Sequence, residues 1–457
     1  MSDVNGADGN ARSNWENLLR SMMGESAARE AMEALEASGF DPSQMAEAAG
    51  LPQDPAALRA MMAQMQRLMA SDSTEGVNWS LAHDIARQTA HEGGDPSLTA
   101  QQASRATTAL SVADLWLDAA TDFPPSGGAR NAWSRAQWVE NTLPTWKRLS
   151  GPVASSVADA LAQVLGAQTG SLPGLDGGSA SDMLRRLGGS VFGMQVGQGA
   201  GTLAREAFGA TDTGLPLLEG PGQALVVSNI DAFAEGLDAT PAEVLAVIAV
   251  REAAHARLYA HVPWLRAHII ALVEEYARGI TIDVDRMEEA VRSIDPSDAD
   301  ALRSALSGGV FALEVSPEQA AALERLETAL ALVEGWVEDV TARAVAPHVP
   351  HAVPLREMLR RRRAAGGPAE HVFATLVGLQ LRPRRLREAA SLWAALVNVG
   401  GIEARDALWE HPDLLPSGAD LDDPTSFPAR QAAAATQDAD MDAALAQLLD
   451  DETPPQD

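Results

Sequence analysis

One short segment contains the residue types that could carry out hydrolysis. In REAAH (251–255), Glu252 and His255 are three residues apart, which places both side chains on one face of a helix. The pattern His-Glu-x-x-His gives one Zn²⁺ two imidazole ligands and a carboxylate that acts as general base on the zinc-bound water. Glu252 and His255 occupy its second and fifth positions. We therefore predict Glu252 as the catalytic base and His255 as a zinc ligand.

The first position of this pattern is occupied by Arg251 instead of histidine. A guanidinium stays protonated and has no lone pair to donate, so it cannot replace an imidazole as a metal ligand. It also brings a positive charge next to the metal position. Because Glu-x-x-His arises often by chance in helical proteins, this incomplete motif is a weak signal when taken alone.

The composition predicts that this segment lies in a largely helical protein. Hydrophobic residues make up 46% of the 457 residues and aromatic residues only 4%. Ala, Leu, Glu and Arg dominate, and these residues favour helices. Strictly alternating runs of β-branched residues are nearly absent, and ALVV (224–227) is the best candidate for a strand. We expect a mainly α, multi-helical fold with at most a small β element.

Helical periodicity between Gly, Pro and Ser breaks predicts the individual helices. The predicted helices are Trp79–Glu92, Thr99–Thr121, Arg130–Leu149, Pro152–Leu165, Pro241–Tyr259, Pro263–Arg278, Pro317–Arg343, Val353–Ala364, Glu370–Leu379 and Pro383–Val399. In a further stretch, Gly189, Gly193, Gly197 and Gly201 repeat every four residues. That spacing puts the glycines on one helical face, where a second backbone can approach closely, so we predict tight helix packing there.

Shifts in composition divide the chain into three parts. Residues 1–72 combine a polar start with amphipathic helices, and residues 73–424 form the main helical domain. Residues 425–457 are acidic and rich in Pro and Ser, and we expect them to be disordered.

The charge and cysteine content exclude several classes of function. A formal net charge of −29 repels phosphate backbones and anionic lipid, so we expect neither nucleic-acid nor membrane binding. The chain has no cysteine and starts without a secretory signal, which fits a cytoplasmic protein. The one basic concentration lies within residues 360–387. We predict that its arginines pair with the acidic surface or with the C-terminal tail.

Several longer phrases carry a resemblance to a known family. They are VNWSLAHDIARQTA (77–90), SVADLWLDAAT (111–121), WSRAQWVENTLPTWKRL (133–149), GQGAGTLAREAFGATDTGLPL (197–217), REAAHARLYAHVPWLRAH (251–268), LVEGWVEDV (332–340) and residues 360–396. From about Val77 to Pro424 the chain resembles the zincin-like metallopeptidase family of actinobacterial proteins, often labelled zinc-dependent metalloproteases or hydrolases. The resemblance implies a zincin-like fold, a zinc cofactor, and a peptide or protein substrate. The chain departs from the family pattern at Arg251.

The resemblance also implies a third zinc ligand. A catalytic zinc needs three protein ligands and leaves its fourth position to water. The glutamate of the family's Glu-Gly segment corresponds to Glu334. Glu274 competes with it, because its spacing after His255 resembles that of the third ligand in thermolysin-like enzymes. With Arg251 in place, only His255 and one glutamate remain as ligands.

Two functions therefore stay open. The first is a zinc metallohydrolase, specifically a peptidase, that uses His255, Glu334 and Glu252. The second is a non-catalytic binding or scaffold protein in which Arg251 forms an ion pair with Glu334 or Glu252 in place of the metal. Under both, we predict that Arg251→His creates or strengthens zinc binding. The sequence leaves the oligomeric state undetermined.

Overall fold

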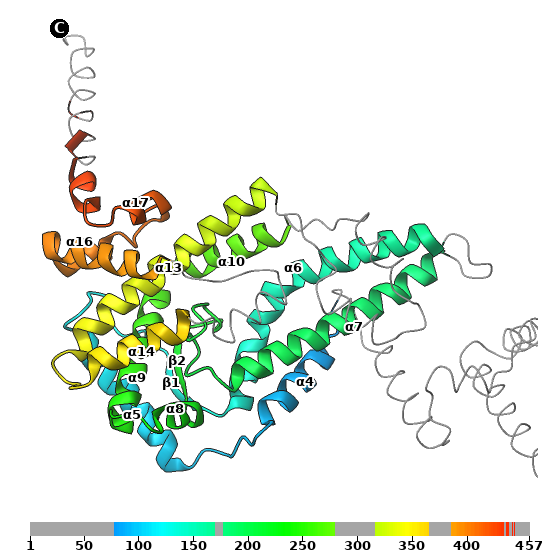
Figure 1. Ribbon diagram of the computed structural model, residues 1–457, viewed down its shortest axis with the longest axis horizontal. Coiled ribbons are helices and arrows are strands. Elements are labelled where there is room, and N and C mark those ends of the chain that lie inside the picture. The colour runs from blue at the N-terminus through cyan, green and yellow to red at the C-terminus, as the bar shows by residue number, and fades with distance from the viewer. Residues whose placement is uncertain are drawn as a thin grey trace, which may run out of the picture. The chain divides into compact units, whose positions relative to one another are not determined.

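The computed structural model describes residues 77–169, 177–278, 316–364 and 385–433, together with 436, 437, 441 and 443. In this part the protein is mainly helical and has one small sheet of two parallel strands (Figure 1), which confirms the predicted fold class. None of its helices is both long and apolar enough to cross a membrane. The predicted helix 370–379 lies outside the described residues, as do residues 1–72, and the three-part division of the chain stays a prediction.

In chain order the helices and strands are α4 (Trp79–His91), α5 (Ala100–Leu117), β1 (Ala129–Trp133), α6 (Arg135–Thr169), α7 (Gly177–Ala204), β2 (Gly222–Val226), α8 (Val227–Ala234), α9 (Pro241–His261), α10 (Pro263–Arg278), α13 (Pro317–Val345), α14 (Ala352–Ala364), α16 (Leu386–Ala407), the 3₁₀ turn η1 (Pro412–Leu414) and α17 (Gly418–Asp422).

Helices α9 and α13 form the centre of the core. Every residue of 247–258 in α9 and of 329–341 in α13 is buried. Helix α9 packs against α5, α13, α14, α8 and β2, and α13 also packs against α16 and α10. A helix covered on all sides belongs to the interior, where even its polar side chains must find partners. The segment 251–255 therefore lies in the core and not on an open surface.

The start of α9 is fixed by local sequence. Thr240 and Glu243 form a capping box, in which each side chain binds the backbone N–H of the other. Pro241 occupies the first turn, where its missing N–H costs nothing. The predicted start is confirmed, and the helix continues two residues past Tyr259 to His261.

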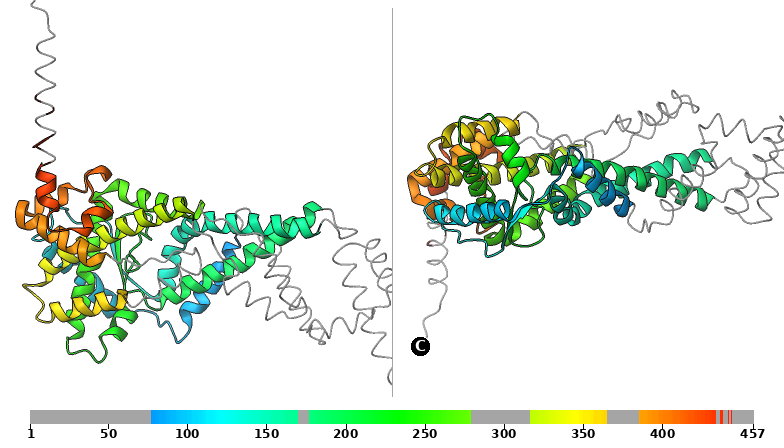
Figure 2. Two further views of the ribbon diagram at one scale, coloured as in Figure 1. Left: turned by 45° about the horizontal axis from the view of Figure 1, so that its top comes forward. Right: turned by 90° about the horizontal axis from the view of Figure 1, so that it is seen from below.

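The glycine repeat brings α7 against α4. A Cβ atom added at Gly193, Gly197 or Gly201 would lie 2.4–2.6 Å from a backbone carbonyl oxygen of Asn78, Ala82 or Ala86. No side chain fits at that distance, so these glycines allow the two backbones to touch. The predicted tight packing is confirmed. Helix α6 lies along α7 as well (Figure 2).

Two predictions for residues 130–165 are wrong. Residues 129–133 form β1, which pairs in parallel with β2 in the register Ala129↔Gly222 to Trp133↔Val226, instead of starting a helix. Its strand partner is distant in sequence, so local periodicity could not indicate it. The predicted break before Pro152 is also absent, because α6 runs through Pro144 and Pro152 to Thr169. Helix α6 packs against α7, α4 and α10, and it continues although each proline lacks the N–H of one backbone hydrogen bond.

Candidate functional site

His255 of α9 and Glu334 of α13 meet inside the core. The His255 Nε2 atom is 3.0 Å from the Glu334 Oε1 atom, and each residue is only 1% exposed. The other ring nitrogen, Nδ1, is 2.9 Å from the Arg251 backbone oxygen one helical turn earlier. The packing of α9 on α13 thus brings together the predicted zinc ligands, which are 79 residues apart in the chain.

The second oxygen of Glu334 is bound by two arginines. The Arg251 Nη2 atom donates to Glu334 Oε2 at 2.9 Å, and Arg363 of α14 contacts the same oxygen through Nη1. Arg251 also donates through Nη1 to Glu338, one turn further along α13, at 3.2 Å. Guanidinium groups from two different helices therefore converge on the Glu334 carboxylate.

The charges around Glu334 keep it ionised. Burial raises the pKa of this carboxyl, but the interactions with Arg363, His255 and Arg251 outweigh burial and hold the pKa well below its ordinary value. The buried carboxylate is thus compensated by cations and hydrogen bonds, as a charge in the interior must be. Its two oxygens are both engaged in these contacts.

Further ion pairs attach α14 to this cluster. Arg356 Nη2 is 2.7 Å from a Glu338 oxygen, and Arg362 Nη1 is 3.2 Å from a carboxylate oxygen of Asp212. Arg363 Nη2 also donates to the Asp212 backbone oxygen at 2.9 Å. The basic run thus pairs within the chain, as expected. The partners of Arg362 and Arg363 are largely buried carboxylates, however, and not the surface or the tail.

Glu252 anchors a loop and the sheet to α9. Its Oε1 accepts hydrogen bonds from the Ala210 and Ala224 amides at 3.1 and 3.2 Å, and its Oε2 accepts from the Thr211 amide and hydroxyl at 3.1 and 2.6 Å. Burial raises the pKa of Glu252, and the donors on Thr211 and Ala224 oppose that rise. A Cβ at position 209 would lie 2.5 Å from Oε2, so this contact requires Gly209. Both oxygens of the predicted catalytic base are occupied by fixed donors.

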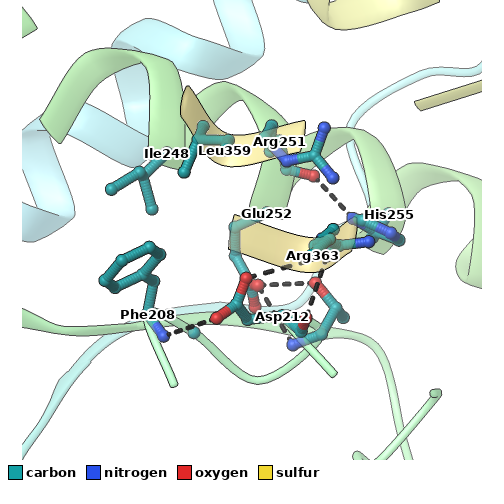
Figure 3. Close-up of a pocket in the computed structure, with 10 residues that line it drawn as sticks. Phe208, Asp212, Ile248, Arg251, Glu252, His255, Leu359 and Arg363 are labelled. Carbon is teal, nitrogen blue, oxygen red and sulfur yellow. Dashed lines mark hydrogen bonds and ion pairs between the residues drawn. The ribbon is translucent and has the colours of Figure 1, made fainter. Parts of the chain in front are cut away.

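A small cavity lies beside these groups. Its volume of about 20 Å³ can hold roughly one water molecule, which is too small for a peptide side chain. Figure 3 shows Arg251, His255 and Arg363 gathered around it. Its wall is formed by Phe208, Gly209, Thr211, Asp212, Ile248, Arg251, Glu252, His255, Leu359 and Arg363.

This arrangement of side chains does not fit a zinc ion. Both ring nitrogens of His255 already have oxygen partners within the chain, the Arg251 backbone oxygen at Nδ1 and Glu334 Oε1 at Nε2. Within the described ranges, no group of three or more His, Cys, Asp or Glu side chains is placed to hold a metal. The competing candidate, Glu274 of α10, is not among the residues that line the cavity. Two guanidiniums bind Oε2 of Glu334 and so place positive charge beside the oxygen that faces His255.

Sequence reasoning did not identify Glu338, Asp212 or Arg363 as members of this cluster. Glu338 follows Glu334 by four residues, so their position on one helical face was readable from the sequence. Asp212 lies in a loop, and Arg363 is one of four consecutive arginines. No local pattern distinguishes it from its neighbours, because only the docking of α14 on α9 directs it inward.

The lowered pKa of Asp212 predicts a pH-dependent contribution to stability. Burial raises this pKa, but the charges of Arg362 and Arg363 and the Phe208 amide lower it overall. The contribution is therefore present above the unfolded-state pKa of about 3.9 and is lost as pH falls through the lower folded-state pKa. We expect Asp212→Asn to lower the free energy of unfolding at pH 6 by about 1–3 kcal/mol. In urea titrations this difference from the wild type should shrink towards pH 3, and a difference that stays constant would contradict the pairing.

The chain is similar to a known protein family and to a solved crystal structure. The family model of the zincin-like metallopeptidases matches residues 77–427. The crystal structure of a protein from Chloroflexus aurantiacus, described as a putative hydrolase with a novel fold, aligns with a TM-score of 0.56 at 18% identity. The alignment covers 78% of this chain and 98% of that one, and at this identity it shows a shared fold alone. No curated protein matches the chain. Because the family model spans well over half of its residues, this chain belongs to the zincin-like metallopeptidase family.

Proposed function

We propose that this chain is a non-catalytic member of its family, in which an ion-pair cluster takes the place of the metal and the helical fold serves as a binding or scaffold protein. The proposal rests on the contacts that the two carboxylate oxygens of Glu334 make. One of its oxygens faces His255, and the other binds both Arg251 and Arg363. In this reading Arg251 stands where the motif requires the first histidine.

The environment of Glu252 supports the same proposal. A general base must be free to accept a proton from a water beside the metal. The two oxygens of Glu252 instead accept four hydrogen bonds from the 210–211 loop and from β2. The carboxylate therefore acts as a structural acceptor. A peptide or protein partner and a cytoplasmic location stay predictions from sequence.

The zinc content of the purified protein tests this function. We expect far less than one zinc per chain in tag-free protein that is purified without added metal or chelator, because Arg251 and Arg363 occupy the candidate ligand Glu334. Elemental analysis after gel filtration measures the number of zinc ions per chain directly. About one zinc per chain would refute the proposal, and peptide hydrolysis that stops on treatment with a chelator would support a metallopeptidase instead.

A second function, zinc-dependent peptide hydrolysis, has one specific observation in its favour. The two predicted ligands, His255 and Glu334, already lie side by side, 3.0 Å apart, in a chain that belongs to a metallopeptidase family. This function requires Arg251 and Arg363 to leave Glu334. The same zinc measurement therefore distinguishes the two functions.

A further inference from the structure

Arg363 contacts the same oxygen of Glu334 as Arg251 does, yet it comes from a different helix. We infer that Arg363 is a second determinant that keeps zinc away from His255 and Glu334, so that replacing Arg251 alone does not create a zinc site. This inference rests on the proposed function, because it takes Arg251 to stand in a ligand position. It also revises the expectation from sequence that Arg251→His would be sufficient.

The shared oxygen is the first support for this inference. When Arg251 is replaced, Arg363 still binds Glu334 Oε2. The positive charge of this guanidinium repels a cation that approaches the same carboxylate. Arg363 also donates to the Asp212 backbone oxygen, so its position does not depend on Arg251.

The anchoring of α14 is the second support. Arg356 pairs with Glu338, and Arg362 pairs with Asp212 and lies with its guanidinium carbon 4.0 Å from the ring centroid of Phe208. Neither contact involves Arg251. Helix α14 therefore stays docked in an Arg251 variant, and it continues to hold Arg363 against Glu334.

The remaining geometry is suited to a metal once both arginines are gone. Two ligands of one tetrahedral zinc, each about 2.0–2.1 Å from the ion, lie about 3.3 Å apart. His255 Nε2 and Glu334 Oε1 are 3.0 Å apart, so a small adjustment is enough. A histidine placed at position 251 would lie four residues before His255 on the same helical face. Together with His255 and Glu334 it would complete three protein ligands.

Zinc affinities of matched variants test the inference. We would compare the wild type, Arg251→His, and the double variant Arg251→His/Arg363→Met, in which methionine keeps an apolar stem without the charge. The control is Arg251→His/Arg361→Met, because Arg361 lies on the same helix, has a 77% exposed side chain and pairs only with Glu357 among the described residues. Each chelator-stripped protein is titrated with zinc against a chromophoric chelator. Circular dichroism verifies folding, and cobalt spectra report the coordination geometry.

We expect the Arg363 double variant to bind one zinc at least about tenfold more tightly than Arg251→His, a change of the size that neighbouring groups produce at metal sites. It should also give the intense visible bands of tetrahedral cobalt. The Arg361 control should behave like Arg251→His. If Arg251→His alone binds zinc as tightly as the double variant, the role of Arg363 is refuted while the proposed function stands. A folded double variant without zinc affinity also refutes it. Stoichiometric zinc in the wild type refutes the proposed function itself.

Discussion

Replacing Glu334 by glutamine is expected to lower the free energy of unfolding by about 3–5 kcal/mol, the range for breaking a buried ion pair from one side. Glu334 is 1% exposed and compensates both Arg251 and Arg363. Glutamine has nearly the same volume but carries no charge. The variant therefore leaves two guanidiniums in the core with too little negative charge, without creating a cavity.

Urea denaturation at pH 7, followed by circular dichroism, measures this loss. Glu275→Gln is a matched control, since Glu275 forms an ion pair with Arg325 at 2.6 Å in which both side chains are about half exposed. An exposed pair of this kind contributes at most about 1 kcal/mol. If the two substitutions destabilise the protein equally, the Glu334 cluster does not stabilise the core in the way described.

Replacing Glu252 by glutamine is expected to destabilise the fold by about 2–4 kcal/mol, because buried donors would lose their acceptor. The terminal amide of glutamine carries one acceptor oxygen and one NH2 donor. In either orientation the NH2 group would face hydrogen-bond donors of the protein. Turned one way, it faces the Ala210 and Ala224 amides; turned the other, it faces the Thr211 amide and hydroxyl. The substitution would loosen the loop before β2 from α9.

This result separates a structural role for Glu252 from a catalytic one. A pure general base can be changed to glutamine with loss of activity and little loss of stability. We expect the opposite here, measured by thermal and urea unfolding. Glu274→Gln, a change of the same type on half-buried Glu274 of α10, should shift stability by no more than about 0.5 kcal/mol. Unchanged stability in Glu252→Gln would mean that these four hydrogen bonds are not needed for folding.

The proposed function also requires the scaffold of a metal site to remain folded when arginines replace the metal. In a zinc site the cation balances the buried carboxylate and orders the helices around it. In this chain, Arg251 and Arg363 supply positive charge to Glu334, and their guanidiniums connect α9, α13 and α14. The cost of burying these charges is offset only while every partner is present. This explains the large effect that we expect from Glu334→Gln.

The helical class and the starts of several helices could be predicted from the amino-acid sequence. Pro241, Pro263 and Pro317 mark the starts of α9, α10 and α13 as predicted, because capping and proline act through the nearest few residues. The glycine repeat correctly indicated a close helix contact, since its period of four residues is a local property. Arg251, Glu252 and His255 could be singled out for the same reason.

The surroundings of those residues depend on contacts between elements that are distant in sequence. Strand β1 exists because β2, some 90 residues later, supplies its hydrogen-bond partners. Glu252 faces loop donors that no spacing rule connects to it. Arg363 reaches Glu334 only because α14 docks on α9, whereas its neighbour Arg361 points to solvent. Charge interactions act between side chains that are close in space, so the balance at Glu334 depends on helix packing and not on the sequence near any one of its members.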